Sequence, residues 1–590
     1  MLKYTPPLED IKFNLRAFGY ADKVASMEDF QDFDLDTFND IMEAYSDFCV
    51  GELYPLNQAA DHEGLKFDPS KPYASVTMPK GFKEAYKGFV ENGYPSLSQP
   101  VEYGGAGAPH TLSVMASEVL IACNKSFSMC PGLTTGLLDA LVAHGTDELK
   151  ERFMEKMVSG EWSGTMCLTE PQCGTDLGLM TTRAEPFGDH YKITGTKIWI
   201  TFGEHDLTDN IVHLVLARLP DAPAGIKGIS VFLVPKFKED GSPNGVTCGG
   251  LEHKMGIHAS PTCVINLEDA EGWLVGEPHK GMRSMFVMMN AARLNVGIEG
   301  LALAEAAYQG ALAFAKDRRQ SRSLNPARND KDASADNILV HPDVRRMLLN
   351  VKSTNEALRG LVAWIAINYD VMHHHPDEET RQKASDLVAL LTPIIKSYGS
   401  ERGFENVSES MQVMGGAGYT QDWPVEQYLR DVRIAMIYEG TNHIQALDLV
   451  GRKLPMKGGR LMLNFAAEAQ EVMGAAAQIE SLAPLAAALG KHAMKLQQVT
   501  MDMSGKAFED REVVGAVASN YLNLFALVTL GVVWLKQLLA LENEPDGPFK
   551  TGKHQTARYF FDMVLPEAGL YARLVGVGKE PMMDFNVDLL

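Results

Sequence analysis

The chain has 590 residues, of which 45% are hydrophobic, and a formal net charge of −22 at pH 7. This length and composition predict several compact domains with large cores and exclude intrinsic disorder. The negative charge disfavours nucleic acids and anionic membrane surfaces as partners, because binding to either depends on basic patches. We therefore expect an acidic cytoplasmic protein that binds neither nucleic acid nor membranes.

The N-terminal segment and the cysteines predict no export and no cross-links. Residues 1–10 lack the apolar stretch of a signal peptide and the Arg- and Ser-rich composition of a transit peptide. The seven cysteines form no CxxC pair and no His/Cys metal pattern, so we expect reduced thiols and no metal. The histidine run at 373–375 cannot place its members on one helix face, which favours a solvated helix end.

The predicted elements change type twice along the chain. From Asp34 to about Gly160, apolar residues recur at three- and four-residue spacing, which predicts helices. Between Met166 and Val275, alternating and β-branched runs separated by Gly and Pro predict strands, including 191–194, 211–216 and 229–234. From Met282 onward the pattern predicts long helices again, including 294–315, 344–369 and 385–398.

A last boundary is predicted at 452–459, which is rich in Lys, Gly and Pro. Amphipathic helices dense in Ala, Leu and Met follow over 461–541. Their most apolar part, 522–541, contains Lys536, so its uncharged run is shorter than the ~20 residues that cross a bilayer. We expect a buried helix there.

One carboxylate is distinguished by its setting. Glu439 lies between Tyr438 and Gly440 in an otherwise apolar, Met-rich stretch. Burial disfavours the charged form of a carboxyl group and raises its pKa, which makes Glu439 a candidate base near neutral pH. An ordinary turn carboxylate would look the same in isolation, so the assignment depends on other motifs.

Three other motifs accompany Glu439 in a fixed order: LTEPQCGTD at 168–176, KIWITFG at 197–203 and QVMGGAGYT at 412–420. The ordered set resembles the acyl-CoA dehydrogenase family, whose members oxidise the Cα–Cβ bond of CoA thioesters with FAD. The resemblance runs from the turn at Tyr103 to Asn442, with weaker signals beyond. It implies an FAD-dependent oxidoreductase acting on CH–CH groups, with an electron-transfer flavoprotein as electron acceptor.

The resemblance implies an α+β fold of the acyl-CoA dehydrogenase type. With the predicted elements, it divides the chain into an N-terminal extension and helical domain (1–162), a central β-domain (163–281), a helical bundle with the base (282–455) and an extra C-terminal helical domain (456–590). Most members would end before the last of these. Its apolar face predicts a homodimer, because it would cover the face through which smaller relatives pair dimers into tetramers.

Removal of an α-proton and a β-hydride requires a base, a hydride acceptor and polarisation of the thioester carbonyl. No side chain accepts hydride, so a flavin must. By resemblance, Glu439 is the base, and its backbone N–H helps to polarise the carbonyl. The resemblance also implies contacts to the flavin ring by Leu168, Thr169, Trp199, Thr201 and Thr441, and to its pyrophosphate by Thr175.

Other carried-over positions concern the adenosine and the substrate. Arg318, Gln412 and Gly416 match residues that hold the FAD adenosine of a second subunit. Arg293 matches a CoA-contacting position, with Asn290 near the pantetheine, although Arg293 also fits an ordinary charge on a helix surface. The loop with Thr175 departs from the family pattern, since QCGTD at 172–176 replaces the usual GAGSD and loses a glycine.

Several alternatives stay open. The glycine runs at 104–107 and 415–418 suggest a dinucleotide fold, but neither follows a strand and opens a helix, which disfavours NAD. An acyl-CoA oxidase would use the same base and flavin. A DNA-binding flavoprotein of this fold would need a basic tail, and 461–590 is not basic. The opening pattern at 4–15, the chain length and the helical tail resemble those of a bacterial subgroup of the family. Members of this subgroup oxidise short acyl groups, including an acyl group that contains a thioether. The alternative is a general short- or medium-chain acyl-CoA dehydrogenase.

Overall fold

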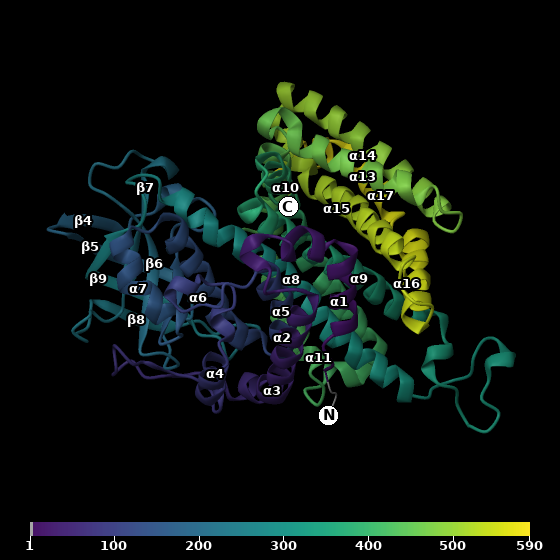
Figure 1. The fold of residues 1–590 in the computed structure, drawn as a ribbon, viewed down its shortest axis with the longest axis horizontal. Helices are drawn as coiled ribbons and strands as arrows, with labels where there is room; N and C mark the ends of the chain where they lie inside the picture. Colours follow the sequence, from purple (N-terminus) through teal and green to yellow (C-terminus); the bar gives the residue numbers. More distant parts are fainter. Residues whose placement is uncertain (1–3) are drawn as a thin grey trace. The chain divides into compact units, whose positions relative to one another are not determined.

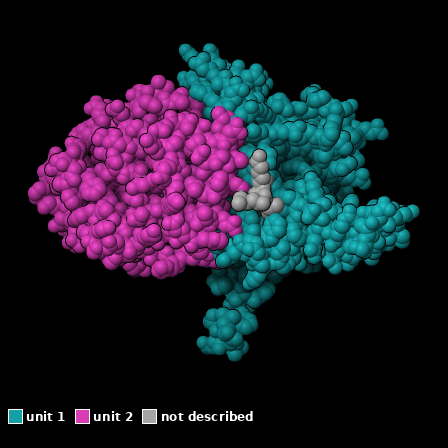
Figure 2. All heavy atoms as spheres, turned by 90° about the horizontal axis from the view of Figure 1, so that it is seen from below, with its two compact units in different colours: residues 1–43, 109–118, 293–590 teal, residues 44–108, 119–292 magenta. Residues whose placement is uncertain are grey.

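The computed structural model describes residues 4–590, apart from the side chains at 507 and 508 (Figure 1), and the chain forms two compact units (Figure 2). Unit 1 comprises residues 1–43, 109–118 and 293–590, and unit 2 comprises 44–108 and 119–292. Three helices run from one unit into the other: α2 (Leu35–Phe48), α5 (His110–Cys123) and α8 (Gly281–Asp317). The predicted order of helices, strands and helices along the chain is confirmed.

Unit 2 is built around a seven-stranded sheet within its described residues. Its strands are β3 (Trp162–Cys167), β4 (Arg183–Phe187), β5 (His190–Thr201), β6 (Asn210–Arg218), β7 (Ile229–Pro235), β8 (Val246–Leu251) and β9 (Thr262–Leu274). Strands β6, β4, β5, β9 and β7 pair in sequence, and β7 pairs again with β6 to close the ring. The strands predicted at 191–194, 211–216 and 229–234 are thereby confirmed.

Both faces of the central strand β6 are buried, which explains its unbroken apolar run. Val212 and Leu214 pack with Leu137 and Phe153, while Val215 lies in a second apolar cluster on the opposite face. Leu137 and Phe153 belong to α6 (Lys125–His144) and α7 (Asp147–Val158). The remaining elements of unit 2 include α3 (Tyr54–Glu63), α4 (Phe82–Glu91) and the short strands β1 (Lys66–Phe67) and β2 (Val76–Thr77).

Unit 1 is helical. Its helices, besides parts of α2, α5 and α8, are α1 (Leu8–Ala17), α9 (Pro342–His374), α10 (Glu378–Met414), α11 (Val425–Val432), α12 (Asn442–Asp448), α13 (Arg460–Ala476), α14 (Ala483–Glu509), α15 (Arg511–Leu541), α16 (Pro548–Tyr559), α17 (Glu567–Val577) and α18 (Glu580–Met583). Side-chain caps set several boundaries: Asp377 accepts from Thr380 N at the start of α10, and Asp510 accepts from Glu512 N at the start of α15. Between α12 and α13, the predicted boundary at 452–459 consists of short helical turns, with Lys457 and Gly458 at positive φ.

Helix α15 is long and apolar enough to cross a membrane, but 83% of its most apolar stretch is buried in the protein. It packs against α9, α14 and α17 of unit 1. The prediction of a buried helix at 522–541 is therefore confirmed. The histidine run lies at the exposed end of α9, and no group of potential metal ligands occurs among the described residues. All seven cysteines are free and buried.

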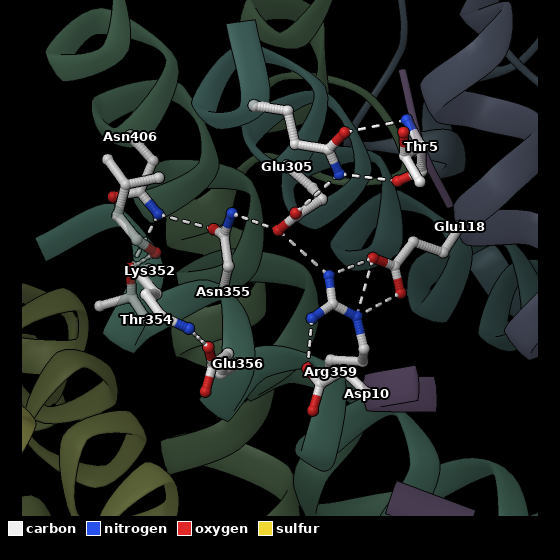
Figure 3. Close-up of polar contacts among 12 residues, drawn as sticks. Thr5, Asp10, Glu118, Glu305, Lys352, Thr354, Asn355, Glu356, Arg359 and Asn406 are labelled. Carbon is white, nitrogen blue, oxygen red and sulfur yellow. Dashed lines mark hydrogen bonds and ion pairs between the residues drawn. The ribbon is translucent and has the colours of Figure 1, made fainter. Parts of the chain in front are cut away.

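A buried charge network connects the helices of unit 1 (Figure 3). Arg359 of α9 bonds Glu118 of α5 through Nε (2.9 Å) and Nη2 (2.6 Å), Asp10 of α1 through Nη1 (2.5 Å) and Glu305 of α8 through Nη2 (3.2 Å). Lys553 of α16 pairs with Asp10 as well. The network thus ties the first helix and a C-terminal helix to the long helices between them.

Candidate active site

The segment with Glu439 has an unusual backbone. Glu439 has φ +57° and the following Gly440 has φ +83°. A positive φ is uncommon for a glutamate, and such strain persists only where surrounding contacts hold it. The buried side chain of Gln445 supplies such contacts, since its Nε2 donates to the carbonyl oxygens of Glu439 (3.0 Å) and Gly440 (3.2 Å).

Helix α10 contacts the other end of this segment through Asn442. Lys396 Nζ donates to Asn442 Oδ1 at 3.0 Å, and Ser400 Oγ donates to the same oxygen at 3.2 Å. Asn442 Nδ2 in turn donates to the carbonyl oxygen of Ser397 at 3.1 Å. The loop from Glu439 to Asn442 is therefore anchored on both sides, by Gln445 and by α10.

The electrostatic setting suits Glu439 to accept a proton. Burial raises the pKa of Glu439 to about 7, although the positive charges of Arg293 and Lys396 oppose this shift and Glu299 adds to it. The neighbouring Tyr438 hydroxyl donates to the Glu299 carboxylate. The backbone N–H of Glu439 has no acceptor among the described residues. A carboxyl group with a pKa near 7 and an unused backbone N–H thus lie on one residue.

Arg293 lies on α8 and is only 6% exposed, so its interpretation as a helix-surface charge is wrong. Its closest carboxylate is Asp448, with 3.8 Å between Nη1 and Oδ2, and its Nε has no partner among the described residues. Burial lowers the pKa of Arg293, while Asp448 and Glu439 act in the opposite direction. A buried guanidinium with an unused donor can bind an anionic or carbonyl group. Asn290, three residues earlier on α8, is exposed.

Thr441 forms the N-cap of α12. Its hydroxyl oxygen accepts a hydrogen bond from Ile444 N at 3.4 Å, and the side chain is otherwise exposed. This cap starts the helix immediately after the strained turn. The contact between Thr441 and a flavin stays a prediction.

In unit 2 the structure brings the motifs at 168–176 and 197–203 together. Ile198 N donates to the carbonyl oxygen of Thr169 at 2.9 Å, and Lys197 Nζ donates to that of Leu168 at 3.1 Å. Glu170 and Lys197 form a buried ion pair at 2.9 Å, with side-chain exposures of 1% and 0%. The sequence assigned no role to either residue, because 27 positions separate them and nothing local predicts their pairing.

The Glu170 carboxylate organises the whole loop. It accepts hydrogen bonds from the backbone and hydroxyl groups of Thr181 (2.7 and 2.9 Å) and Thr182 (3.0 and 2.5 Å). Burial alone would raise the pKa of Glu170, but Lys197 and these hydrogen bonds outweigh it and lower the pKa to about 2. The carboxylate is therefore ionised throughout the neutral range and holds the strand-to-loop connection in one conformation.

The Trp199 side chain is exposed at a break in the regular pairing of β5. The pairing with β9 shifts register between Lys197 and Ile200, and Trp199 has φ +60° with 60% of its surface exposed. Bulges commonly redirect one side chain next to a functional site. Thr169 and Thr201 near this position are partly buried. An exposed aromatic ring with hydroxyl groups and anchored backbone near it fits a planar flavin ring.

Thr175 is exposed on the loop after β3. The sequence alone did not predict the conformation of this loop, because it lacks a glycine of the family pattern. Arg218 of β6 bonds the end of this loop: its Nη2 donates to the carbonyl oxygens of Gly178 (2.7 Å) and Gly225 (2.8 Å), and its Nε donates to that of Met180 (3.1 Å). The loop is thus held by a guanidinium and leaves the Thr175 hydroxyl available.

The residues matched to the adenosine lie on the surface of unit 1. Arg318 follows α8, Gln412 lies near the end of α10, and Gly416 lies in the turn Gly415–Tyr419; all are exposed. The glycine run at 415–418 follows a helix, and the run at 104–107 follows the short turn Val101–Tyr103, so neither has the strand–turn–helix context of a dinucleotide fold.

Four family models match consecutive parts of the chain. They are the acyl-CoA dehydrogenase N-terminal domain (36–161), middle domain (165–270) and C-terminal domain (279–454), and the acetyl-CoA dehydrogenase C-terminal-like domain (465–586). The last match falls within the extra helical region.

Curated relatives match the chain over nearly its full length. The 3-methylmercaptopropionyl-CoA dehydrogenase of Ruegeria pomeroyi is 39% identical over 98% of this chain and 99% of its own. A butyryl-CoA dehydrogenase of Syntrophomonas wolfei is 34% identical over 95% of each chain. A broad-specificity linear acyl-CoA dehydrogenase, FadE5 of Mycobacterium tuberculosis, is 33% identical over 96% of each.

Two solved structures share the fold. ACDH-11 of Caenorhabditis elegans, in complex with C11-CoA, aligns with a TM-score of 0.80 and 18% identity over 99% of this chain and 95% of its own. An acyl-CoA dehydrogenase of Bacillus anthracis, complexed with FAD, aligns with a TM-score of 0.76 and 23% identity over 93% and 89%. These likenesses, with the family matches, confirm the predicted fold class, including the extra C-terminal helical domain.

Proposed function

This chain belongs to the acyl-CoA dehydrogenase family, and from that premise we propose that it oxidises 3-methylmercaptopropionyl-CoA to methylthioacryloyl-CoA. As a member it is an FAD-dependent oxidoreductase acting on acyl-CoA thioesters. The substrate assignment rests on the full-length similarity to the Ruegeria enzyme, which includes the N-terminal extension and the C-terminal helices.

In the proposed reaction, Glu439 takes the α-proton of the thioester onto its carboxylate. Its pKa of about 7 matches a base that must be ionised and still bind a proton near neutral pH. The unused backbone N–H of Glu439 donates to the thioester carbonyl and stabilises the charge that develops there. Bound FAD would supply the acceptor for the hydride that leaves the β-carbon.

We assign residues to FAD and substrate by the family positions that they match. For the flavin ring we assign Leu168, Thr169, Trp199, Thr201 and Thr441, and for the pyrophosphate Thr175. Arg318, Gln412 and Gly416 would hold the adenosine of FAD in a second subunit. Arg293 would bind the CoA portion through its unused donor, and Asn290 would lie near the pantetheine.

The chemistry of the thioether favours this substrate. The sulfur is attached to the β-carbon, where its lone pair stabilises the positive character that develops as hydride leaves. The acyl group has about the length of a valeryl chain. A pocket for it would therefore also accept butyryl- and valeryl-CoA, and the butyryl-CoA dehydrogenase relatives support this second candidate.

The test is a panel of CoA thioesters assayed with an artificial electron acceptor: 3-methylmercaptopropionyl, butyryl, valeryl, octanoyl and dodecanoyl. We expect the highest kcat/KM for the thioether, with ~10- to 200-fold discrimination, because a methylene or an isosteric sulfur in an apolar pocket yields no more. A maximum of kcat/KM at dodecanoyl-CoA, with little activity on the thioether, would reject this substrate and retain only the proposed reaction class.

Two further assays address the alternative functions. The yield of hydrogen peroxide separates a dehydrogenase from an oxidase. A DNA shift assay tests the DNA-binding alternative, and we expect no shift.

The physiological setting follows from the same proposal. Electrons would pass to an electron-transfer flavoprotein, and the enzyme would act in the cytoplasm in dimethylsulfoniopropionate breakdown. We propose a homodimer, because Arg318, Gln412 and Gly416 match positions that hold the FAD of a second subunit and all three are exposed. The net charge of −22 supports the absence of nucleic-acid and membrane partners.

A further inference from the structure

Lys396 is a buried lysine without a direct carboxylate partner. Its side chain is fully buried in the middle of α10, and its Nζ donates to the amide oxygen of Asn442 at 3.0 Å. Lysines are rarely buried unless they are paired, because removing an ammonium group from water is costly. A neutral amide alone does not offset that penalty. The cost of burying the Lys396 ammonium must therefore be offset by other charged groups near it.

Three charged groups of unit 1 act on this ammonium: Glu439, Glu299 and Arg293. Glu439 and Glu299 raise the pKa of Lys396, Arg293 opposes them, and burial, the largest effect, lowers the pKa to about 8. The Tyr438 hydroxyl donates a hydrogen bond to the carboxylate of Glu299. Lys396 is thus still charged at neutral pH and acts on the Glu439 carboxylate, whose pKa it lowers.

Asn442 connects Lys396 to the turn that contains Glu439. It stands three residues after Glu439 and begins α12, and its side chain bonds Lys396, Ser400 and the Ser397 carbonyl. Glu401 of α10 also hydrogen-bonds Asn442. This side chain has its donors and its acceptor occupied by a single helix, so α10 fixes one end of the strained turn at Glu439.

We propose that Lys396 is a positioning residue for α-proton abstraction: through Asn442 it holds the left-handed turn at Glu439, and it supplies the positive charge that keeps this carboxylate ready to accept a proton. The inference rests on the proposed role of Glu439 as base. It assigns to α10 the task of setting both the place and the basicity of that carboxylate, while Gln445 holds the other side of the turn.

The test compares Lys396→Met with Lys396→Arg in the FAD holoenzyme, by the rate of anaerobic flavin reduction with 3-methylmercaptopropionyl-CoA and butyryl-CoA as a function of pH. In the plot of this rate against pH, the rise on the acidic side (the acidic limb) reports the pKa of the base. Loss of the ammonium should raise that apparent pKa by about one unit. The rate at pH 7 should fall ~10-fold and partly recover at higher pH. Lys396→Arg should keep the limb near its original position.

Lys553→Met is the matched control, since Lys553 is an equally buried lysine of unit 1 that lies in the Arg359 network. It should lower the thermal midpoint without moving the acidic limb. Backbone amide exchange gives a readout independent of turnover: residues 438–442 should exchange faster in Lys396→Met than in the control. An unchanged limb and unchanged exchange in Lys396→Met would overturn the proposal.

Asn442→Ala decides the matter if Lys396→Met fails to fold, because Asn442 is partly exposed and its truncation leaves the charges in place. It should speed exchange at 438–442 and lower the flavin reduction rate ~10-fold at every pH. Wild-type exchange and rate in this variant would contradict the positioning role. Normal flavin reduction by Glu439→Gln would instead reject the proposed base, whereas an inactive Glu439→Gln beside a normal Lys396→Met would reject this inference alone.

Discussion

The side-chain amide of Gln445 holds the main chain of Glu439: its Nε2 lies 3.0 Å from the Glu439 carbonyl oxygen and 3.2 Å from that of Gly440. Gln445 is fully buried and belongs to α12, six residues after Glu439. A helix that begins at Asn442 thus reaches back and stabilises the two left-handed residues before it.

Replacing Gln445 by Leu should release this turn. The variant keeps the volume but leaves two carbonyl oxygens without their donor, which costs about 1–3 kcal/mol of unfolding free energy. Flavin reduction by substrate should slow ~10-fold or more, because the base loses its position. Stopped-flow reduction and urea unfolding check both effects. The exposed Gln478 provides a control, since Gln478→Leu should change neither.

Glu439→Gln should retain FAD and substrate binding but lose at least ~10² in turnover, because a positioned base is removed. In the native enzyme the base must be ionised, so kcat/KM should rise with pH through about 7. The measurements are flavin content, a substrate-binding titration and single-turnover reduction over pH. Near-normal flavin reduction in the variant would refute the assignment.

The same substitution should affect stability in a pH-dependent way. The pKa of Glu439 is raised to about 7 from its ordinary value of 4.5, so its contribution to stability is present at low pH and is lost as pH rises through 7. Glu439→Gln should therefore raise the thermal midpoint at pH 8 relative to wild type and have little effect at pH 5. A variant that is less stable at pH 8 would contradict the burial that raises this pKa.

Glu170→Gln should loosen the loop that carries Thr169 and Thr175. It leaves Lys197 buried with no counter-charge, which should cost about 3–5 kcal/mol of unfolding free energy at pH 7. Because the pKa of Glu170 is lowered to about 2, its contribution is complete above pH 4.5 and is lost as pH falls toward 2, so the difference from wild type should shrink in acid. FAD retention on a desalting column should fall in parallel. The double variant with Lys197→Met should recover part of the stability, and no recovery would argue against the ion pair as the cause.

Arg359→Leu should be among the most damaging substitutions in unit 1. It leaves the carboxylates of Glu118, Asp10 and Glu305 buried without their shared cation (Figure 3). We expect a loss of at least ~3 kcal/mol of unfolding free energy in urea. Arg558→Leu is the control: its ion pair with Asp562 is exposed and should contribute less than ~1 kcal/mol. Equal effects of the two substitutions would mean that burial adds nothing to the Arg359 network.

Light scattering of the full-length holoenzyme should give the mass of a homodimer. The reason is the added helical mass after residue 456, whose apolar face would cover the surface used for tetramer formation by smaller relatives. The subunit mass of 64.7 kDa separates dimer from tetramer clearly. A stable tetramer would reject this arrangement.

Local patterns in the sequence determined the elements and the candidate base. Alternating β-branched runs at 211–216 and helical spacing at 344–369 depend on neighbours within a few positions, and both elements formed as predicted. Glu439 was recognisable because its motif is contiguous with Tyr438 and Gly440. For Arg293 the sequence left two interpretations open, a CoA contact and a charge on a helix surface, and its burial in the protein excludes the second.

Tertiary structure alone decided which polar and charged side chains from distant parts of the sequence meet. Lys197 lies 27 positions from Glu170, Lys396 lies 46 from Asn442, and Arg359 lies 349 from Asp10. None of these pairs leaves a periodic signal, because its two members lie far apart in the sequence on different elements or loops. Their significance arises only when folding removes them from water together, since a buried charge is tolerated where another polar group is brought to meet it.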